Sequence, residues 1–223
     1  SIELNHILTM AATTLSNSFQ QGGDAIAIII PSKPKALTVS YKSLSAEVAS
    51  FQQKLAHLGI APQSAVSIAL PNTYEFIVAF LASSWQRAIA APLNSAYKQD
   101  EFEFYIDDLK SALALVPKGS FQRNDPAVRA ARKYRAAIAE CYWDDQRGEV
   151  VMDIKDEGKL KGMGCQMVER AQPDDVALVL HTSGTTGRPK AVSSSEASLH
   201  QSANILWVPL THRNLTRTMS WST

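Results

Sequence analysis

The sequence predicts an α/β fold, with a mostly parallel sheet flanked by helices. Between residues 65 and 143, short apolar runs alternate with longer stretches whose apolar residues recur at helical spacing. This alternation is typical of parallel strands joined by right-handed helical crossovers. Prolines and glycines stand between several of these runs, where a chain has to turn. The 223 residues suffice for one or two domains with a sizeable core.

Before residue 60 the pattern predicts a helix, a hairpin and a second helix, over residues 5–20, 25–41 and 43–58. Gly22-Gly23 is expected to end the first helix. Ser43 is expected to cap the second helix, because its hydroxyl can accept from the free amides of a first turn. Gly59 is expected to stop that helix.

The following stretch predicts strands at 65–70, 88–91 and 112–116 and helices at 74–86 and 100–110. A further helix is expected from about Pro126 to Ala139, capped by Asp125, with one more strand within 138–143. Residues 144–173 are rich in charge and glycine and have no clear period. They are expected to form a loop or hairpin that joins two subdomains.

Composition argues against several classes of function. Lys+Arg number 22 and Asp+Glu 21, so no charge excess indicates a nucleic-acid partner. The two cysteines, Cys141 and Cys165, predict neither a disulfide framework nor a metal-ligand motif. No apolar run reaches the roughly 18 residues of a membrane span, and the N-terminus lacks a signal-peptide pattern. The expectation is an intracellular protein without a membrane span.

Residues 176–190 carry the clearest chemical signal. The apolar run at 176–180 predicts a buried strand. After His181 the sequence turns to threonine, serine and glycine, a composition that suits a polyphosphate. Glycines let the backbone approach an anion closely, hydroxyls donate hydrogen bonds, and a lysine adds a mobile positive charge. The candidate phosphate ligands are Thr182, Ser183, Gly184, Thr185, Thr186, Gly187 and Lys190.

This stretch has two other interpretations, of which the first stays open and the second is excluded. Gly184-Thr-Thr-Gly187 alone is equally compatible with an ordinary polar loop after a strand. A Walker A loop is excluded by spacing, because it needs four residues between its first glycine and Gly-Lys. Here two residues separate the glycines, and Pro189 precedes the lysine.

The whole string Thr182-Ser-Gly-Thr-Thr-Gly-Arg-Pro-Lys190 is more specific, and it resembles the phosphate-binding signature of the adenylate-forming (AMP-binding) superfamily. Two earlier stretches look like the same family: Pro71-Asn-Thr-Tyr-Glu-Phe-Ile-Val-Ala-Phe-Leu81, and Ala91-Pro-Leu-Asn-Ser-Ala-Tyr97 with Glu101-Phe-Glu-Phe-Tyr105 after it. The resemblance spans about residues 5–191. It is nearest to the fungal and plant peroxisomal CoA synthetases, the branch of oxalate–CoA ligase beside 4-coumarate–CoA ligase.

The resemblance implies an ATP-dependent acid–thiol (acyl-CoA) ligase. In that family the loop holds the β- and γ-phosphates of ATP while a carboxylate attacks the α-phosphate, and CoA then displaces AMP from the acyl-adenylate. The resemblance therefore implies ATP, Mg²⁺ and CoA, a small-molecule carboxylate substrate, and the cytoplasm or peroxisome as compartment. A carrier-protein thiol in place of CoA stays open, as in the adenylation domains of peptide synthetases.

The chain departs from the family pattern after Lys190. Residues 192–207 are expected to be an insertion, because their removal joins Ala191 to Val208 and restores an uninterrupted family sequence. A retained intron and a genuine loop insertion both fit. On the family's pattern, residues 1–170 form the N-terminal α/β subdomain, and 171–223 hold the first strand and phosphate loop of the next.

The family's acyl-pocket wall, ribose-binding aspartate and C-terminal domain would lie beyond Thr223. No catalytic residue is therefore assigned, and no metal ligand. The rival hypothesis is an inactive, truncated relic or gene-model fragment that binds nucleotide weakly at best. The strand at 176–180 would belong to a second sheet, and without its neighbours it has to dock on the first subdomain, pair with another chain or stay disordered.

Three other features receive structural interpretations. His181 is interpreted as structural, since the sequence shows no partner that would make it a base. Asp107-Asp108 is interpreted as a pair of solvated or capping carboxylates rather than a catalytic pair. His57, near a helix end, is expected to interact with the helix dipole.

Overall fold

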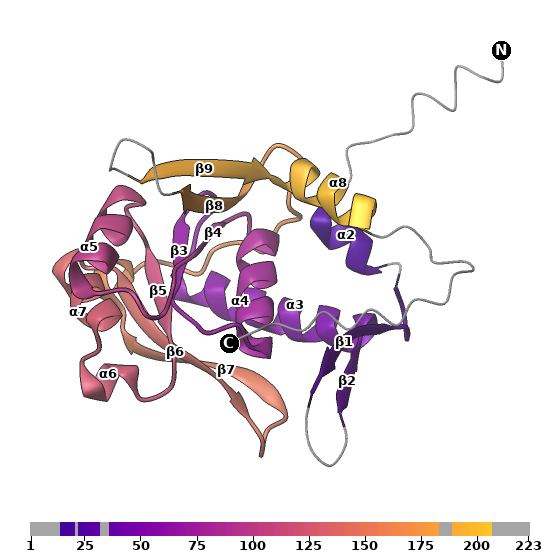
Figure 1. The fold of residues 1–223 in the computed structure, drawn as a ribbon, viewed down its shortest axis with the longest axis horizontal. Coiled ribbons are helices and arrows are strands. Elements are labelled where there is room, and N and C mark those ends of the chain that lie inside the picture. The colour runs from indigo at the N-terminus through magenta and orange to yellow at the C-terminus, as the bar shows by residue number, and fades with distance from the viewer. Residues whose placement is uncertain (1–13, 21, 32–35, 183–188, 207–223) are drawn as a thin grey trace.

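The computed structural model describes residues 14–20, 22–31, 36–182 and 189–206, and its fold is the predicted α/β arrangement (Figure 1). A seven-stranded sheet forms the body of the molecule, and a two-stranded sheet stands at one end. The small sheet pairs β1 (Ile26–Ile30) with β2 (Leu37–Ser40) antiparallel, which confirms the predicted hairpin. Of the helix predicted over 5–20, the described part is α2 (Leu15–Gln20), and residues before 14 lie outside the described range.

The large sheet has the strand order β7-β6-β5-β3-β4-β8-β9. Its strands are β3 (Ala65–Ile68), β4 (Ile89–Pro92), β5 (Leu113–Val116), β6 (Ala137–Asp144), β7 (Glu149–Asp156), β8 (Val176–Thr182) and β9 (Lys190–Ser195). The inner strands from β6 to β8 pair parallel, whereas the edge strands β7 and β9 pair antiparallel. Every residue of β3 and β5 is buried, as expected for parallel strands covered on both faces.

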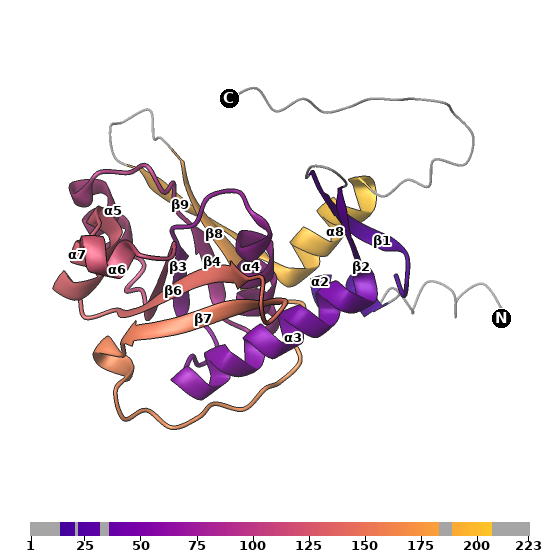
Figure 2. The same ribbon diagram turned by 90° about the horizontal axis from the view of Figure 1, so that it is seen from below.

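Helices cover both faces of this sheet (Figure 2). Besides α2 they are α3 (Tyr41–Leu58), α4 (Tyr74–Trp85), α5 (Gln99–Asp108), α6 (Ser120–Arg123), α7 (Pro126–Lys133) and α8 (Glu196–Leu206), with a 3-10 turn at Gly158–Leu160. On one face, α3 and α4 pack in a core that contains Phe51. On the other face, α5 and α7 pack in a second core that contains Phe102. The sheet is therefore the middle of three layers.

The start of α3 differs from the prediction. Ser40, and not Ser43, is the cap, because the amide of Ser43 donates to the Ser40 hydroxyl over 3.1 Å. The helix accordingly begins at Tyr41, directly after β2. Both residues are serine, so composition alone does not separate them. At the other end Gly59 stops the helix as predicted, with a left-handed φ of 95°.

The helix predicted from Pro126 to Ala139 is shorter in the structure. It ends at Lys133, and β6 begins at Ala137, earlier than the strand expected within 138–143. Arg135 adopts a φ of 56°, a left-handed conformation that interrupts the helix. The alanines on both sides of this turn are small and apolar enough to fit a buried helix or a buried strand, so the periodicity continues through the break.

Residues 144–175 contain both structures that the sequence left open. The first part is a hairpin, in which β7 pairs antiparallel with β6. From Lys161 the chain then runs without a helix or strand to Val176, where β8 starts. This irregular segment is tied to the body of the protein, since the Gln166 amide donates to the carbonyl of Ala56 over 2.9 Å.

The strand predicted at 176–180 was expected to belong to a second sheet, and this is wrong for the described residues, because β8 is part of the seven-stranded sheet. It lies parallel to β4, with Leu178 opposite Ala90. The segment 192–207 forms the rest of β9 and helix α8 over its described residues. Ser193–Ser195 continue the ladder with β8, and Glu196 starts the helix. Its status as an insertion relative to the family stays a prediction.

Candidate phosphate-binding site

Strand β8, which carries the candidate loop, lies next to β4. The helices that follow β3 and β4 lie on opposite faces of the sheet. From β3 the chain continues into α4 on one face, whereas from β4 it continues into α5 on the other face. In open α/β sheets, ligands bind where the connections of neighbouring strands part in this way, at the carboxyl ends of the strands. Strand β8 is the parallel neighbour of β4, so its carboxyl end opens at the same edge.

The hairpin of β8 and β9 brings the two described candidate ligands face to face. Thr182 is the register partner of Lys190, and its hydroxyl lies 3.4 Å from the Lys190 carbonyl oxygen. Both residues are exposed at the open end of the hairpin. The remaining candidates, Ser183, Gly184, Thr185, Thr186 and Gly187, lie outside the described residues. The placed pair thus consists of a hydroxyl and an ammonium at the two ends of the loop.

Strand alternation separates this pair from His181. Residues 180 and 182 of β8 face one side of the sheet with their partners Val192 and Lys190, and His181 faces the other side. On that side the His181 imidazole meets α5, where its Nε2 lies 3.0 Å from the Asp108 Oδ2. The imidazole is almost fully enclosed, with a side-chain exposure of 4%, whereas the Asp108 side chain is 47% exposed.

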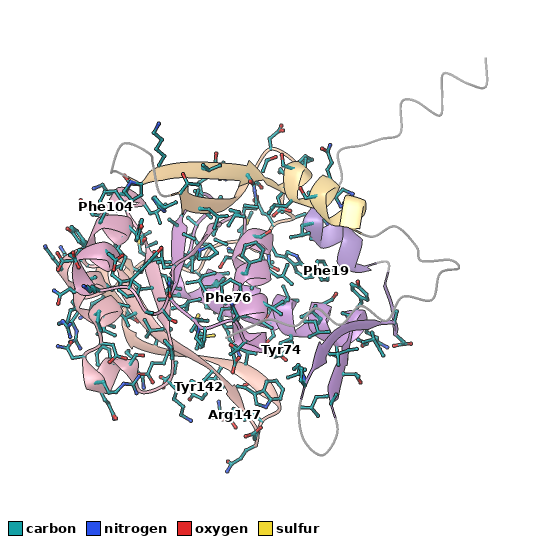
Figure 3. The ribbon with its side chains drawn as sticks, viewed as in Figure 1. Phe19, Tyr74, Phe76, Phe104, Tyr142 and Arg147 are labelled. Carbon is teal, nitrogen blue, oxygen red and sulfur yellow. The ribbon has the colours of Figure 1, made fainter. Side chains whose placement is uncertain are left out.

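Two aromatic rings of α5 complete the surroundings of His181. The ring centroid of Tyr105 lies 4.6 Å from that of His181, and Phe104 approaches edge-on at 6.3 Å. Figure 3 labels Phe104 on α5, below the β8–β9 hairpin. Burial raises the pKa of Tyr105 to about 12, and its hydrogen bond with Tyr97 acts in the same direction. Tyr105 is therefore neutral at physiological pH, and Asp108 supplies the charge beside the imidazole.

Asp107 and Asp108 are about half exposed, in keeping with the interpretation as solvated carboxylates, and each also has a cationic or imidazole partner. The two carboxylates have separate partners, since Asp107 binds Lys110 over 2.6 Å and Asp108 binds His181. A signal for this was present in the sequence. Acidic residues in the last turn of a helix oppose the helix dipole, so two of them there indicate that a cationic partner is near. His57 contacts its own helix, with its Nδ1 2.7 Å from the Gln53 carbonyl oxygen.

At its other end, β8 is fixed by a bidentate ion pair. The Arg87 guanidinium donates to both oxygens of Asp175, through Nε over 2.9 Å and Nη2 over 3.2 Å. It also donates to Glu169 over 2.6 Å. Asp175 immediately precedes β8 and accepts from the Gln172 amide as well. Arg87, in the turn between α4 and β4, thus fixes the start of β8. A bidentate pair of arginine and carboxylate defines the geometry more closely than a single hydrogen bond does.

Helix α8 begins at a buried carboxyl. Glu196 has no exposed surface, and it accepts hydrogen bonds from the Leu15 amide over 3.0 Å and from the Ser84 hydroxyl. Burial raises the pKa of Glu196, while these two hydrogen bonds oppose that rise and nearby Asp175 adds to it. The Glu196 amide in turn donates to the Asp175 carbonyl over 3.0 Å. One carboxyl therefore joins α2, α4 and α8 next to the entry of β8.

A cavity of about 420 Å³ lies at the opposite edge of the sheet, away from the candidate site. Ala65, the first residue of β3, and Ala112, just before β5, line it, so it opens at the amino ends of these strands. Lys110 and Lys159 also line it. Burial lowers the pKa of Lys159, and the charge of Lys110 acts in the same direction. This cavity and the candidate phosphate loop are separate features.

Over the described ranges no group of three or more histidine, cysteine, aspartate and glutamate side chains could hold a metal ion. The thiol of Cys141 is buried, which raises its pKa, and Cys165 is exposed, and both are free. Among the helices that the structure describes, none has the length and apolar character to cross a bilayer.

Comparison with known proteins identifies the family to which a chain with this fold and this hairpin belongs. Residues 15–222 match the family of AMP-binding enzymes, and the chain belongs to this family. It is 41% identical over 144 residues to the oxalate–CoA ligase of Arabidopsis thaliana, a match that covers 65% of this chain and 27% of that protein. It is 34% identical over 207 residues to the oxalate–CoA ligase of Saccharomyces cerevisiae, covering 82% of this chain and 38% of that protein.

Solved structures share the same fold. The crystal structure of apo MatB from Rhodopseudomonas palustris superposes with a TM-score of 0.67 at 22% identity, over 87% of this chain and 37% of that chain. The chain thus spans well under half the length of the relatives that it matches.

Proposed function

We propose that this chain supplies the part of an AMP-forming acid–CoA ligase that holds the phosphates of ATP. The observation that supports the proposal is the pairing of Thr182 with Lys190 at the open end of the β8–β9 hairpin, beside the carboxyl end of β4. A loop closed by this pair has a hydroxyl and an ammonium at its base. Both groups donate hydrogen bonds to phosphate oxygens, and the ammonium offsets their charge.

The proposed chemistry is the attack of a carboxylate on the α-phosphate of ATP, with pyrophosphate as the leaving group. The role of this chain is to bind and orient the pyrophosphate part and to stabilise the charge that develops on it. Lys190 contributes the charge, and Thr182 a hydroxyl donor. Ser183, Gly184, Thr185, Thr186 and Gly187 complete the proposed loop with backbone amides and hydroxyls.

The other participants follow from the kind of relative. A small carboxylic acid is the proposed substrate, with oxalate the first to test because two relatives are oxalate–CoA ligases. CoA is the proposed acceptor of the acyl group. Mg²⁺ is the proposed companion of ATP.

The test is calorimetric binding of ATP and of pyrophosphate to the 223-residue chain. Lys190→Ala is expected to weaken pyrophosphate binding about tenfold to a hundredfold, the value of one hydrogen bond to a charged group. Thr182→Val is expected to weaken it less, by about two- to tenfold, because it removes a neutral donor. Lys161→Ala, at an exposed lysine of the irregular segment, is the matched control.

Binding is the appropriate readout, because the chain spans only 27% and 38% of the two oxalate–CoA ligases. Turnover is a separate question, and we expect no ATP–pyrophosphate exchange from these 223 residues with oxalate or another carboxylate. The proposal fails if the wild-type chain binds neither ATP nor pyrophosphate at millimolar concentration. It also fails if Lys190→Ala binds pyrophosphate as well as Lys161→Ala does.

A further inference from the structure

The carboxyl half of β8 is paired with β9, through Leu180–Val192, His181–Ala191 and Thr182–Lys190. The described register between β4 and β8 is the pair Ala90–Leu178, before the last part of β8. Beyond it, Leu180 is 44% exposed and its cross-strand partner Val192 is 49% exposed. The other neighbour of β8 is β9, which is itself the edge of the sheet. Within the sheet, the base of the loop is therefore paired with an edge strand.

His181 supplies a further contact from the side. It precedes Thr182, and it points away from Thr182 and Lys190 toward α5. Its ring packs against Tyr105 at an interplanar angle of 52° and contacts Asp108, so one enclosed side chain is held by both packing and a polar partner. The charged and titratable groups around it are Asp108 and Tyr105 from α5 and, on the far side of the ribbon, Lys190 from β9.

We propose that Asp108 and His181 form a positioning pair that fixes Thr182 and Lys190 where they can bind pyrophosphate. The inference rests on the proposed function, since it assigns a role to residues that the phosphate would not touch. Asp108 acts through His181, and His181 acts through the backbone that it shares with Thr182. The pair links α5, the helix that follows β4, to the base of the loop.

A double-mutant cycle on pyrophosphate affinity tests this pair. Asp108→Ala removes the acceptor, and His181→Phe keeps a ring against Tyr105 but removes the hydrogen bond. Each single variant is expected to weaken pyrophosphate binding about two- to fivefold, as for a partly exposed ion pair. The double variant is expected to be no weaker than the single variants, because the same interaction is lost in all three.

Asp107→Ala is the matched control, since the neighbouring carboxylate has similar exposure but binds Lys110 instead. It is expected to bind pyrophosphate like the wild type. A second readout separates positioning from mere stability: pyrophosphate should shift the nuclear magnetic resonance signals of the His181 ring in the wild type and in Asp107→Ala. In Asp108→Ala, compared at saturating pyrophosphate, that shift should be smaller, while the thermal midpoint stays near that of Asp107→Ala.

Each possible result of these measurements either supports or overturns the positioning role. Equal affinity of Asp108→Ala and Asp107→Ala overturns the inference and leaves the proposed function intact. Additive losses in the double variant, or a ring signal indifferent to pyrophosphate, overturn it as well. If the wild-type chain fails to bind pyrophosphate, the proposed function fails first, and the positioning role fails with it.

Discussion

Glu196 permits a quantitative test of how helix α8 is held in the fold. Glu196→Ala removes the acceptor of the Leu15 amide and of the Ser84 hydroxyl. Ser84 can turn its hydroxyl to the carbonyl one helical turn earlier, as Ser83 already does with Ala79. The Leu15 amide then carries the cost, about 1–3 kcal/mol for a buried group without a partner. At ~2 kcal/mol, the thermal midpoint should fall by about 4–8 °C.

Glu196→Gln separates the charge from the hydrogen bonds. Glutamine has nearly the same volume, and its oxygen can accept from the Leu15 amide while its NH₂ donates to the Ser84 hydroxyl. Because burial raises the pKa of Glu196 in the folded protein, its contribution to stability is fully present below its unfolded pKa and lost as pH rises through its folded pKa. The variant should therefore gain stability relative to the wild type as pH rises from about 4.5.

The assay is urea unfolding of wild type, Glu196→Ala and Glu196→Gln between pH 4 and pH 8. Glu157→Gln, at an exposed glutamate, is the control for removing one surface charge. The reasoning is refuted if Glu196→Gln and the wild type keep a constant difference in unfolding free energy across this range. It is equally refuted if Glu196→Ala unfolds at the same urea concentration as the control.

Four further substitutions test a helix end, an open turn, the core and a tyrosine ionisation. Gly59→Ala should destabilise by about 1–2 kcal/mol, since φ is 95° and a Cβ there would lie 2.8 Å from the Met163 Cβ. Gly148→Ala, at positive φ in open space, should cost less in the same urea titration. Phe51→Ala should cost about 3–5 kcal/mol, because Phe51 is 1% exposed, and a loss below ~1 kcal/mol would contradict its core position. Tyr105→Phe should remove an ionisation near pH 12 from the ultraviolet titration of the tyrosines. It should not remove an ionisation near pH 10.

Local signals in the sequence were sufficient for most of the fold. Strands and helices from 65 to 116 follow from apolar periodicity and from turn residues such as Pro71. The errors lie where two solutions share one local pattern. Ser40 and Ser43 are equally good caps, and the alanines around Arg135 suit a helix and a strand alike. The choice between such solutions is made by tertiary packing, which a single sequence does not display.

The candidate site was also predictable from the sequence only in part. A string of glycines, hydroxyls and a lysine indicates a phosphate site from its composition, and Thr182 and Lys190 do meet in the structure. The support of that site was not predictable, because the partners are far apart in the chain: His181 and Asp108 are separated by 73 positions, and Glu196 and Ser84 by 112. Only the sheet topology brings them together.

The attachment of β8 also sets an order of assembly during folding. The hairpin of β8 and β9 is local in sequence, whereas Arg87 and Asp175, which fix its entry, are 88 positions apart. Distant contacts form late, since the intervening chain must first lose its freedom. We therefore expect the edge that carries the candidate phosphate loop to be completed after the central sheet has formed. A ligand that requires β8 in place would bind only the fully folded molecule and slow its unfolding. A bound anion would therefore stabilise the product of the last folding step.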